Sequence, residues 1–80
     1  MTVTILAFGA VKEIVGGTSV KIEIPHAVTV EELKALLKER YKELNQLSSL
    51  MIAVNNEYAF ASDLVSEDDE IALIPPVSGG

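Results

Sequence analysis

The sequence predicts an α+β domain in which one main helix packs on one face of a mixed sheet of four or five strands. Two observations lead to this prediction. Short apolar segments near both ends of the chain alternate with a period of two residues, which is typical of strands. Residues 30–43 instead carry apolar side chains at spacings of three and four residues, which is typical of an amphipathic helix. One helix over one face of a sheet buries all of these apolar stripes together.

Residues 2–8 and 19–24 are the first two predicted strands. In residues 2–8 both faces are largely apolar, because Leu6 and Phe8 stand opposite the face of the other aliphatic side chains. Such a strand lies in the centre of a sheet or presents its second face to a partner. Residues 19–24 alternate aliphatic and charged side chains, so we expect this strand to face water on one side. Residues 10–15, between the two strands, predict a single helical turn.

Residues 30–43 predict the main helix. Thr29 and Glu32 match a capping box, in which the threonine hydroxyl accepts from the amide of Glu32 and the carboxylate accepts from the amide of Thr29. Acidic residues in the first turn and basic residues in the last turn suit the helix dipole. The predicted buried stripe consists of Val30, Leu33, Leu36, Leu37, Tyr41 and Leu44.

The remaining strands are predicted at residues 51–54, 57–60 and 70–74. The first two flank Asn55–Asn56, and asparagine tolerates the positive φ that a tight turn requires. Residues 61–66 are expected to be irregular, with at most a single tight turn. A right-handed crossover through the helix makes the last strand run parallel to the first.

This parallel pairing brings the C-terminal ends of the first and last strands together. Phe8 and Ile74 both stand on the face that the helix does not cover, so we expect them to lie near each other. Residues 75–80 leave at the same edge. Their two prolines resist helix and interior strand, and their two glycines carry no side chain. We therefore divide the chain into a domain at residues 1–74 and an extended tail at residues 75–80, although a frayed terminus has the same composition.

The composition excludes several functional classes. Without cysteine, the chain has no disulfide framework, thiolate nucleophile or cysteine-ligated metal. The net charge of −6 argues against nucleic-acid binding, which needs a basic surface. No apolar stretch approaches the roughly 20 residues of a membrane span. We expect a soluble, cytoplasmic protein of one domain.

The charges are unevenly distributed along the chain. All basic residues precede Leu44 and are balanced there by an equal number of acids, whereas only acids follow it. This excess serves solubility, or it steers the protein toward a basic partner surface. The lone His26 and the acidic run Glu67–Glu70 are expected to be solvated rather than metal-binding, since neither supplies a ligand set. We expect no bound metal.

Three stretches form a distinctive set. Residues 8–16 read Phe-Gly-Ala-Val-Lys-Glu-Ile-Val-Gly, and residues 53–57 read Ala-Val-Asn-Asn-Glu. Residues 69–80 comprise an acidic turn, an apolar strand and Pro-Pro-Val-Ser-Gly-Gly. In this order, the three stretches resemble the family of small, sulfur-carrying subunits of molybdopterin synthase. The resemblance covers all 80 residues and implies the ubiquitin-like β-grasp fold.

Two positions depart from the family pattern. Lys12 stands where the family commonly has arginine, so a bidentate guanidinium contact would become a single point-charge contact. Asp68 stands where a glycine is usual in the turn before the last strand. Because aspartate tolerates the left-handed region better than most residues, we expect this turn to form.

The resemblance implies that Gly80 carries the reacting group. Its carboxylate would be adenylated by a ubiquitin-activating-like enzyme that uses ATP, and then converted to a thiocarboxylate. The sulfur would pass to a pyranopterin precursor to build the dithiolene of molybdopterin. Gly79 would thread into the partner's active site on a stalk formed by Pro75, Pro76, Val77 and Ser78. The chain itself would bind no cofactor and would not be catalytic alone.

The resemblance also implies two partners. One is the large synthase subunit, in a heterotetramer of two small subunits on a dimer of large ones, and the other is the activating adenylyltransferase. Phe8, Tyr58 and Ile74 match exposed hydrophobic contact positions of the family, with Lys12 at the rim. From the residues alone, Phe8 and Ile74 also fit a core, Tyr58 an ordinary edge strand and Lys12 a solvated loop. Alone, the chain would be monomeric.

Other functions fit the same residues. A sulfur carrier for thiamine or tRNA thiolation would use identical tail chemistry, and a ubiquitin-like modifier would be conjugated to lysines through Gly80. A β-grasp interaction module would use neither glycine. Residues 8–16 and the Pro-Pro-Val-Ser stalk favour the molybdenum pathway.

Overall fold

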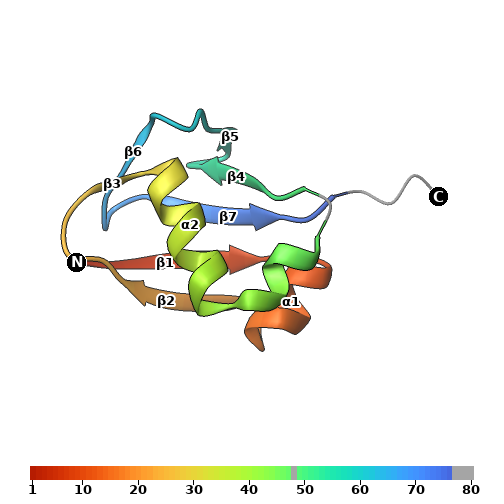
Figure 1. Ribbon diagram of the computed structural model, residues 1–80. Helices are drawn as coiled ribbons and strands as arrows, with labels where there is room; N and C mark the ends of the chain where they lie inside the picture. The colour runs from red at the N-terminus through yellow and green to blue at the C-terminus, as the bar shows by residue number, and fades with distance from the viewer. Residues whose placement is uncertain (48, 77–80) are drawn as a thin grey trace.

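The computed structural model describes residues 1–47 and 49–76, which form one sheet layer and one helical layer (Figure 1). The main sheet has five strands in the order β2-β1-β7-β4-β5, and a second sheet pairs β3 with β6. The elements are β1 (Thr2–Ala7), α1 (Ala10–Val15), β2 (Ser19–Glu23), β3 (Val28–Thr29), α2 (Val30–Arg40), the 3₁₀ helix η1 (Lys42–Gln46), β4 (Met51–Val54), β5 (Glu57–Tyr58), β6 (Leu64–Val65) and β7 (Glu70–Ile74).

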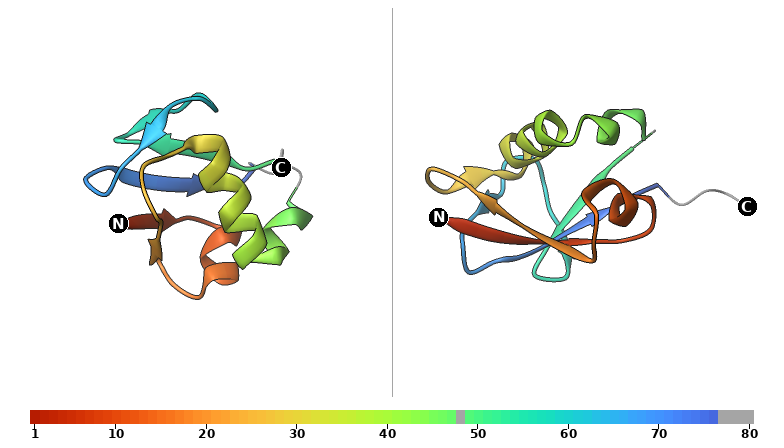
Figure 2. Two further views of the ribbon diagram at one scale, coloured as in Figure 1. Left: turned by 60° about the vertical axis from the view of Figure 1, so that its left-hand side comes forward. Right: turned by 90° about the horizontal axis from the view of Figure 1, so that it is seen from below.

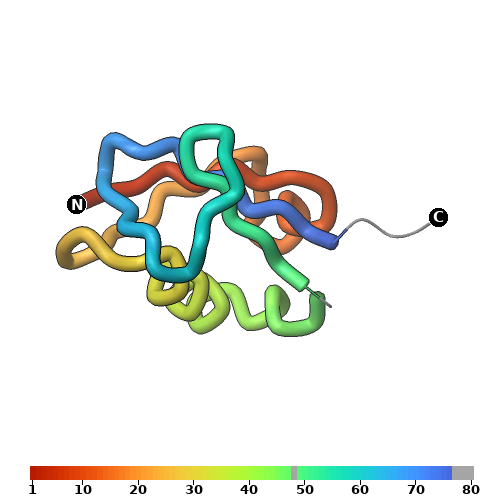
Figure 3. Tube along the Cα trace, turned by 90° about the horizontal axis from the view of Figure 1, so that it is seen from above, coloured from red at the N-terminus to blue at the C-terminus, as the bar shows by residue number. Residues whose placement is uncertain are grey.

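The pairing of β1 with β7 is parallel, as the crossover argument predicts. Ile5 is in register with Ile71, and Ala7 with Leu73. The other neighbours, β2 beside β1 and β4 beside β7, are antiparallel, so the sheet is mixed. The C-terminal ends of β1 and β7 therefore lie side by side, at the end of the sheet opposite Met1 (Figure 3).

The core lies between one face of the sheet and the helical layer (Figure 2). The alternation predicted for β1 is confirmed, because the side chains of Val3, Ile5 and Ala7 are buried, whereas Leu6 is only half-buried and Phe8 is exposed. The largest fully buried side chains are Ile5, Ile22, Leu33, Leu37, Leu44, Ile71, Leu73, Val3, Val11 and Val65.

Helix α2 begins as predicted but ends earlier. The capping box is present, with the amide of Glu32 donating to Thr29 Oγ1 and the amide of Thr29 donating to Glu32 Oε1. The predicted end at residue 43 is wrong, because Tyr41 leaves the helical conformation at φ −119° and ψ 85°. Asn45 Nδ2 donates to the carbonyls of Lys38 and Lys42, which satisfies acceptors at this helix end. Leu44 still joins the core, from η1.

The segment at residues 61–66 contains a strand that the sequence does not predict. In this segment β6 pairs antiparallel with β3, with Val28 opposite Val65. Strands of two residues are too short to produce a periodic pattern, although Val65 is fully buried. The strand predicted at residues 57–60 is correspondingly shorter, since β5 comprises Glu57–Tyr58. Asn55 and Asn56 adopt the expected positive φ, at 53° and 69°.

Gly16 ends α1 in the left-handed conformation, with φ 86° and ψ 24°, and its amide donates to the carbonyl of Lys12. We expect Gly16→Ala to destabilise the fold by about 1 kcal/mol, because a Cβ is disfavoured at this φ even though open space surrounds the site. The melting temperature should then fall by about 4–8 °C. Gly17→Ala is the matched control, since Gly17 lacks this strained φ, and a comparable loss there would contradict the explanation.

Candidate functional site

The face of the main sheet that lies away from the helices (Figure 2) carries neighbouring apolar residues on β1, β7, β4 and β5. The register places Leu6 beside Ala72, Met51 beside Ile74, and Ala53 between Ala72 and Tyr58. Phe8 directly follows β1 and continues the alternation of Leu6. We call this surface the outer patch, and it consists of Leu6, Phe8, Met51, Ala53, Tyr58, Ala72 and Ile74.

Three large side chains of the outer patch are open to solvent. Phe8 is 50% exposed, Met51 47% and Tyr58 65%. Ile74 and Leu6 are half-buried between them. A patch of large apolar side chains on the surface of a small domain indicates an interaction site, because leaving it in water costs free energy.

The root of the tail lies beside the outer patch. Ile74 ends β7, and a Cβ at Gly9 would lie 3.2 Å from Pro75 Cγ, so the proline rests on the backbone that follows Phe8. Gly9 makes this approach possible with φ 52° and ψ −129°, a region that is essentially restricted to glycine. The parallel pairing of β1 and β7 thus brings Phe8, Ile74 and the root of the tail to one edge.

The predicted contact residues divide into two groups. Phe8, Tyr58 and Ile74 share the outer patch. Lys12 is exposed on α1, apart from the strands that form the patch, and its carbonyl accepts from the amides of Gly16 and Gly17. Pro75 and Pro76 are half-buried and lie outside any helix or strand. Val77, Ser78, Gly79 and Gly80 lie outside the described residues.

Met51 and Leu6 are members of the patch that the sequence reasoning did not assign. Their signal is the alternation in β4 and β1, because Ile52 and Ile5 face the core and their neighbours must then face outward. The signal is weak because both faces of these strands are apolar. Phe60 and Leu64 are also exposed, but they do not belong to the patch strands.

The acidic turn before β7 is held by a hydrogen-bond network around Asp69. Its carboxylate accepts from the amide of Ser66 at 2.9 Å and from Asn55 Nδ2 at 3.0 Å, and Asn55 Oδ1 accepts from the amide of Glu70. These donors, first the Ser66 amide and then Asn55, lower the pKa of Asp69. The network joins the Asn55–Asn56 turn to the start of β7. Asp68 needs no left-handed conformation, since Asn55 and Asn56 alone have positive φ among the described non-glycine residues.

The lowered pKa of Asp69 predicts a pH dependence of stability. The folded state favours the ionised carboxylate, so its stabilising effect is complete above the unfolded pKa, near 4, and disappears as the pH falls through the lower folded value. The pKa of Glu32 is lowered in the same direction by the amide and hydroxyl of Thr29. Urea denaturation should therefore show a lower free energy of unfolding at acidic pH than at neutral pH. Asp69→Asn should reduce this difference, whereas Asp68→Asn, with the same change in charge, should preserve it.

The described parts of the chain hold no cluster of metal-binding side chains. Residues 1–47 and 49–76 hold no group of three or more histidine, cysteine, aspartate or glutamate side chains placed to bind a metal ion. In the same residues no helix is both long and apolar enough to cross a membrane. What the arrangement offers is a binding surface next to the root of a tail.

Comparison with known proteins identifies the family. The ThiS family matches residues 5–80. The chain belongs to the ThiS family. A relative from Caenorhabditis briggsae, named molybdopterin synthase sulfur carrier subunit, is 36% identical and aligns over 100% of this chain and 99% of its own length. The resemblance seen in the three sequence stretches is thereby confirmed.

Solved structures agree with the fold of this ThiS-family chain. A putative molybdopterin converting factor, subunit 1, from Pyrococcus furiosus superimposes with a TM-score of 0.85 at 22% identity, over 96% of this chain and 99% of that one. The complex of subunits 1 and 2 of molybdopterin-converting factor from Helicobacter pylori contains a chain with a TM-score of 0.67 and 28% identity, with both chains fully covered. The predicted ubiquitin-like β-grasp fold is confirmed.

Proposed function

We propose that this ThiS-family chain is the sulfur carrier subunit of molybdopterin synthase. The observation that carries the proposal is the outer patch at the root of the tail, because a carrier needs a docking surface that aims its terminal group at a partner. Full-length relatives with this name, at 30–40% identity, support the same role.

The chemistry belongs to the carboxylate of Gly80. A carboxylate at neutral pH is a poor acyl donor because it is an anion without a leaving group. Attack of one carboxylate oxygen on the α-phosphate of ATP gives an acyl-adenylate and releases pyrophosphate. Sulfide from a sulfur donor then attacks the acyl carbon and displaces AMP, and a thiocarboxylate results.

Delivery of the sulfur restores the carrier. The thiocarboxylate sulfur would attack an electrophilic carbon of the pyranopterin precursor, and a carbon–oxygen bond at that carbon would break to release the oxygen substituent. Water would then cleave the acyl–sulfur bond, which leaves the sulfur on the precursor and returns the carboxylate. Each carrier brings one sulfur, so the two sulfurs of a dithiolene require two deliveries. The chain has one histidine and no cysteine, and we assign the groups that move protons in these steps to its partners.

The outer patch would serve both partners in turn. An ATP-using adenylyltransferase would bind it to activate Gly80, and the large synthase subunit would bind it to receive the sulfur. Subunits 1 and 2 of the Helicobacter pylori molybdopterin-converting factor form a protein–protein complex, which supports a large-subunit partner for this chain. We expect the heterotetramer that the family resemblance implies, with Pro75 and Pro76 holding the tail off the sheet.

Intact-mass spectrometry tests the proposal directly. Incubation with the activating enzyme, ATP and a sulfide source should raise the protein mass by one oxygen-to-sulfur exchange. Subsequent addition of the large subunit and the pyranopterin precursor should return the mass to its original value and yield dithiolene product. A protein that never gains the sulfur contradicts the carrier role, and one that gains it but delivers it only to a thiamine or tRNA pathway contradicts the molybdopterin assignment.

A further inference from the structure

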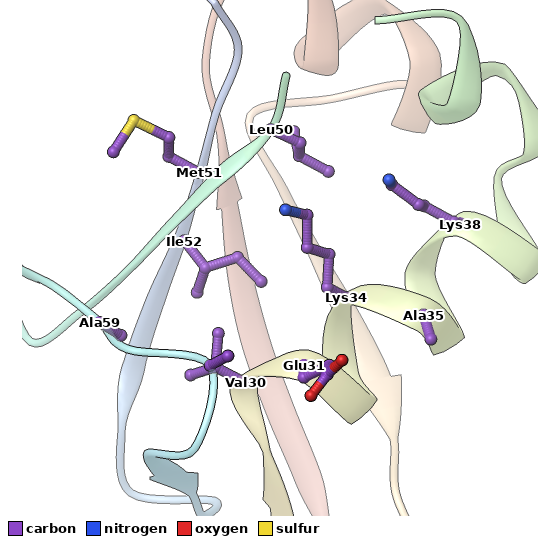
Figure 4. Close-up of a pocket in the computed structure, with 10 residues that line it drawn as sticks. Val30, Glu31, Lys34, Ala35, Lys38, Leu50, Met51, Ile52 and Ala59 are labelled. Carbon is purple, nitrogen blue, oxygen red and sulfur yellow. The ribbon is translucent and has the colours of Figure 1, made fainter. Parts of the chain in front are cut away.

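A groove of about 500 Å³ runs between helix α2 and strand β4 (Figure 4). Its apolar floor is made by the buried side chains of Val30, Leu50 and Ile52. Small residues leave space above this floor, and two lysines stand on the helical side. The small and charged lining residues are Ala35, Ala59, Ala61, Glu31, Lys34 and Lys38.

The groove is a different surface from the outer patch. Leu50, directly before β4, and Ile52 in β4 point toward α2, whereas Met51 points to the other side of the strand (Figure 4). Met51 borders both surfaces, and the other outer-patch residues do not line the groove. A partner on the outer patch therefore leaves most of the groove open.

The charges on the groove favour an anionic occupant. Lys34 and Lys38 are half-buried, so their aliphatic stems cover apolar surface while the ammonium groups reach water. Glu31 is the one acid in the lining, which leaves a net positive rim. Although the protein carries −6 overall, residues 1–43 hold equal numbers of acids and bases, and the excess negative charge lies beyond them. The groove is thus a basic, apolar site on an acidic protein.

The spacing of the lysines fits an extended peptide. Residues four apart on a helix are about 6 Å apart along its axis. Alternate residues of an extended chain are about 6.6–6.8 Å apart and share one face, while the intervening side chains share the other. A segment in which acids alternate with aliphatic residues would therefore present carboxylates to Lys34 and Lys38 and aliphatic side chains to the floor.

We propose that this groove docks an extended, acidic segment of a partner protein, in which acidic and aliphatic residues alternate. The volume of the groove lies within the range of about 300–1,000 Å³ that is usual for small-molecule and cofactor pockets. Because the groove lies outside the outer patch, such a segment binds while the patch is covered.

The test uses the capped peptide Glu-Ile-Glu-Val-Glu-Ile and ¹⁵N-labelled protein. Amide shifts during titration should cluster on the groove residues, chiefly at Lys34, Lys38 and Leu50–Ile52. The double variant Lys34→Glu/Lys38→Glu should weaken binding by about tenfold or more, since two favourable charge pairs become repulsive. Lys21→Glu/Lys42→Glu changes the net charge equally at exposed positions outside the groove and should leave binding within about twofold.

Further arms keep the test decisive. Lys34→Gln/Lys38→Gln removes the two positive charges without adding acids to α2, and it should also weaken peptide binding. This variant replaces Lys34→Glu/Lys38→Glu in the test if the charge-reversed protein folds poorly. Equal binding of a peptide with glutamine in place of glutamate would overturn the proposal, as would shifts confined to the outer patch. Octanoate binding as tightly as the peptide would assign the groove to small anionic amphiphiles instead. Groove shifts that depend on protein concentration without peptide would assign it to a second copy of the chain.

Discussion

Deletion of Gly79 and Gly80 is expected to abolish sulfur transfer, to the level measured without any carrier. The truncated protein lacks the carboxylate that the activating enzyme would adenylate, and its new terminus is shorter and bears a side chain. The domain at residues 1–74 and the outer patch remain, so binding to the large subunit should stay measurable. Dithiolene product formation and isothermal titration calorimetry measure the two quantities separately.

Two outcomes of the deletion would contradict the proposed carrier role. Sulfur transfer by the truncated chain would show that the carboxylate of Gly80 does not carry the sulfur. Unchanged biological function of the truncated protein would favour an interaction module in which the glycines are incidental. Ser78→Thr is the matched control, because it changes the stalk without shortening it, and this variant should retain transfer.

Phe8→Asp is expected to weaken binding of the large subunit by about 2–3 kcal/mol, or roughly 30–150-fold. Phe8 is half-exposed beside the tail root, and a carboxylate there would be buried without a partner once the large subunit covers the patch. The free energy of unfolding should change by less than about 1 kcal/mol, because the side chain is not in the core. Calorimetry gives the affinity, and urea denaturation gives the stability.

Leu64→Asp provides the matched control for Phe8→Asp. Leu64 is 66% exposed, compared with 50% for Phe8, but it belongs to the small β3–β6 sheet rather than to the outer patch. This variant should bind the large subunit with unchanged affinity. An equal loss of binding in the two variants would mean that added negative charge, not the patch, determines affinity.

The elements that the sequence predicts best are those with long or redundant signals. The stripe of α2 extends over several turns and is reinforced by the Thr29–Glu32 capping box, and the alternation of β7 is flanked by an acidic turn and a proline. The parallel pairing of β7 with β1 follows from the right-handedness of crossover connections and not from the identity of particular residues. The pairing of β3 with β6 has no comparable signal in the sequence, because a strand of two residues is too short to show an alternation of apolar and polar side chains.

The residues of the candidate site could be predicted from the sequence only where the alternation of side chains within one strand assigns them to a face. Phe8 and Ile74 could be assigned to one face from their alternation. Met51 could not, because its exposure depends on which side of β4 the helix covers, and that is settled only by tertiary packing. The groove has no sequence signal for the same reason. Its lining brings Lys34 and Lys38 on α2 together with Leu50, which is distant in the chain.

The contact of Pro75 with Gly9 has a kinetic consequence. Since the proline rests on the loop that follows β1, the starting direction of the tail is fixed relative to the outer patch. A partner that captures the patch would thereby confine the proposed reactive terminus to a small volume near its own active-site entrance. The second step would then be intramolecular, with an effective concentration in the millimolar range for a short linker. Gly9 would thus shorten the search between capture and reaction, because it admits Pro75 to the backbone that follows Phe8.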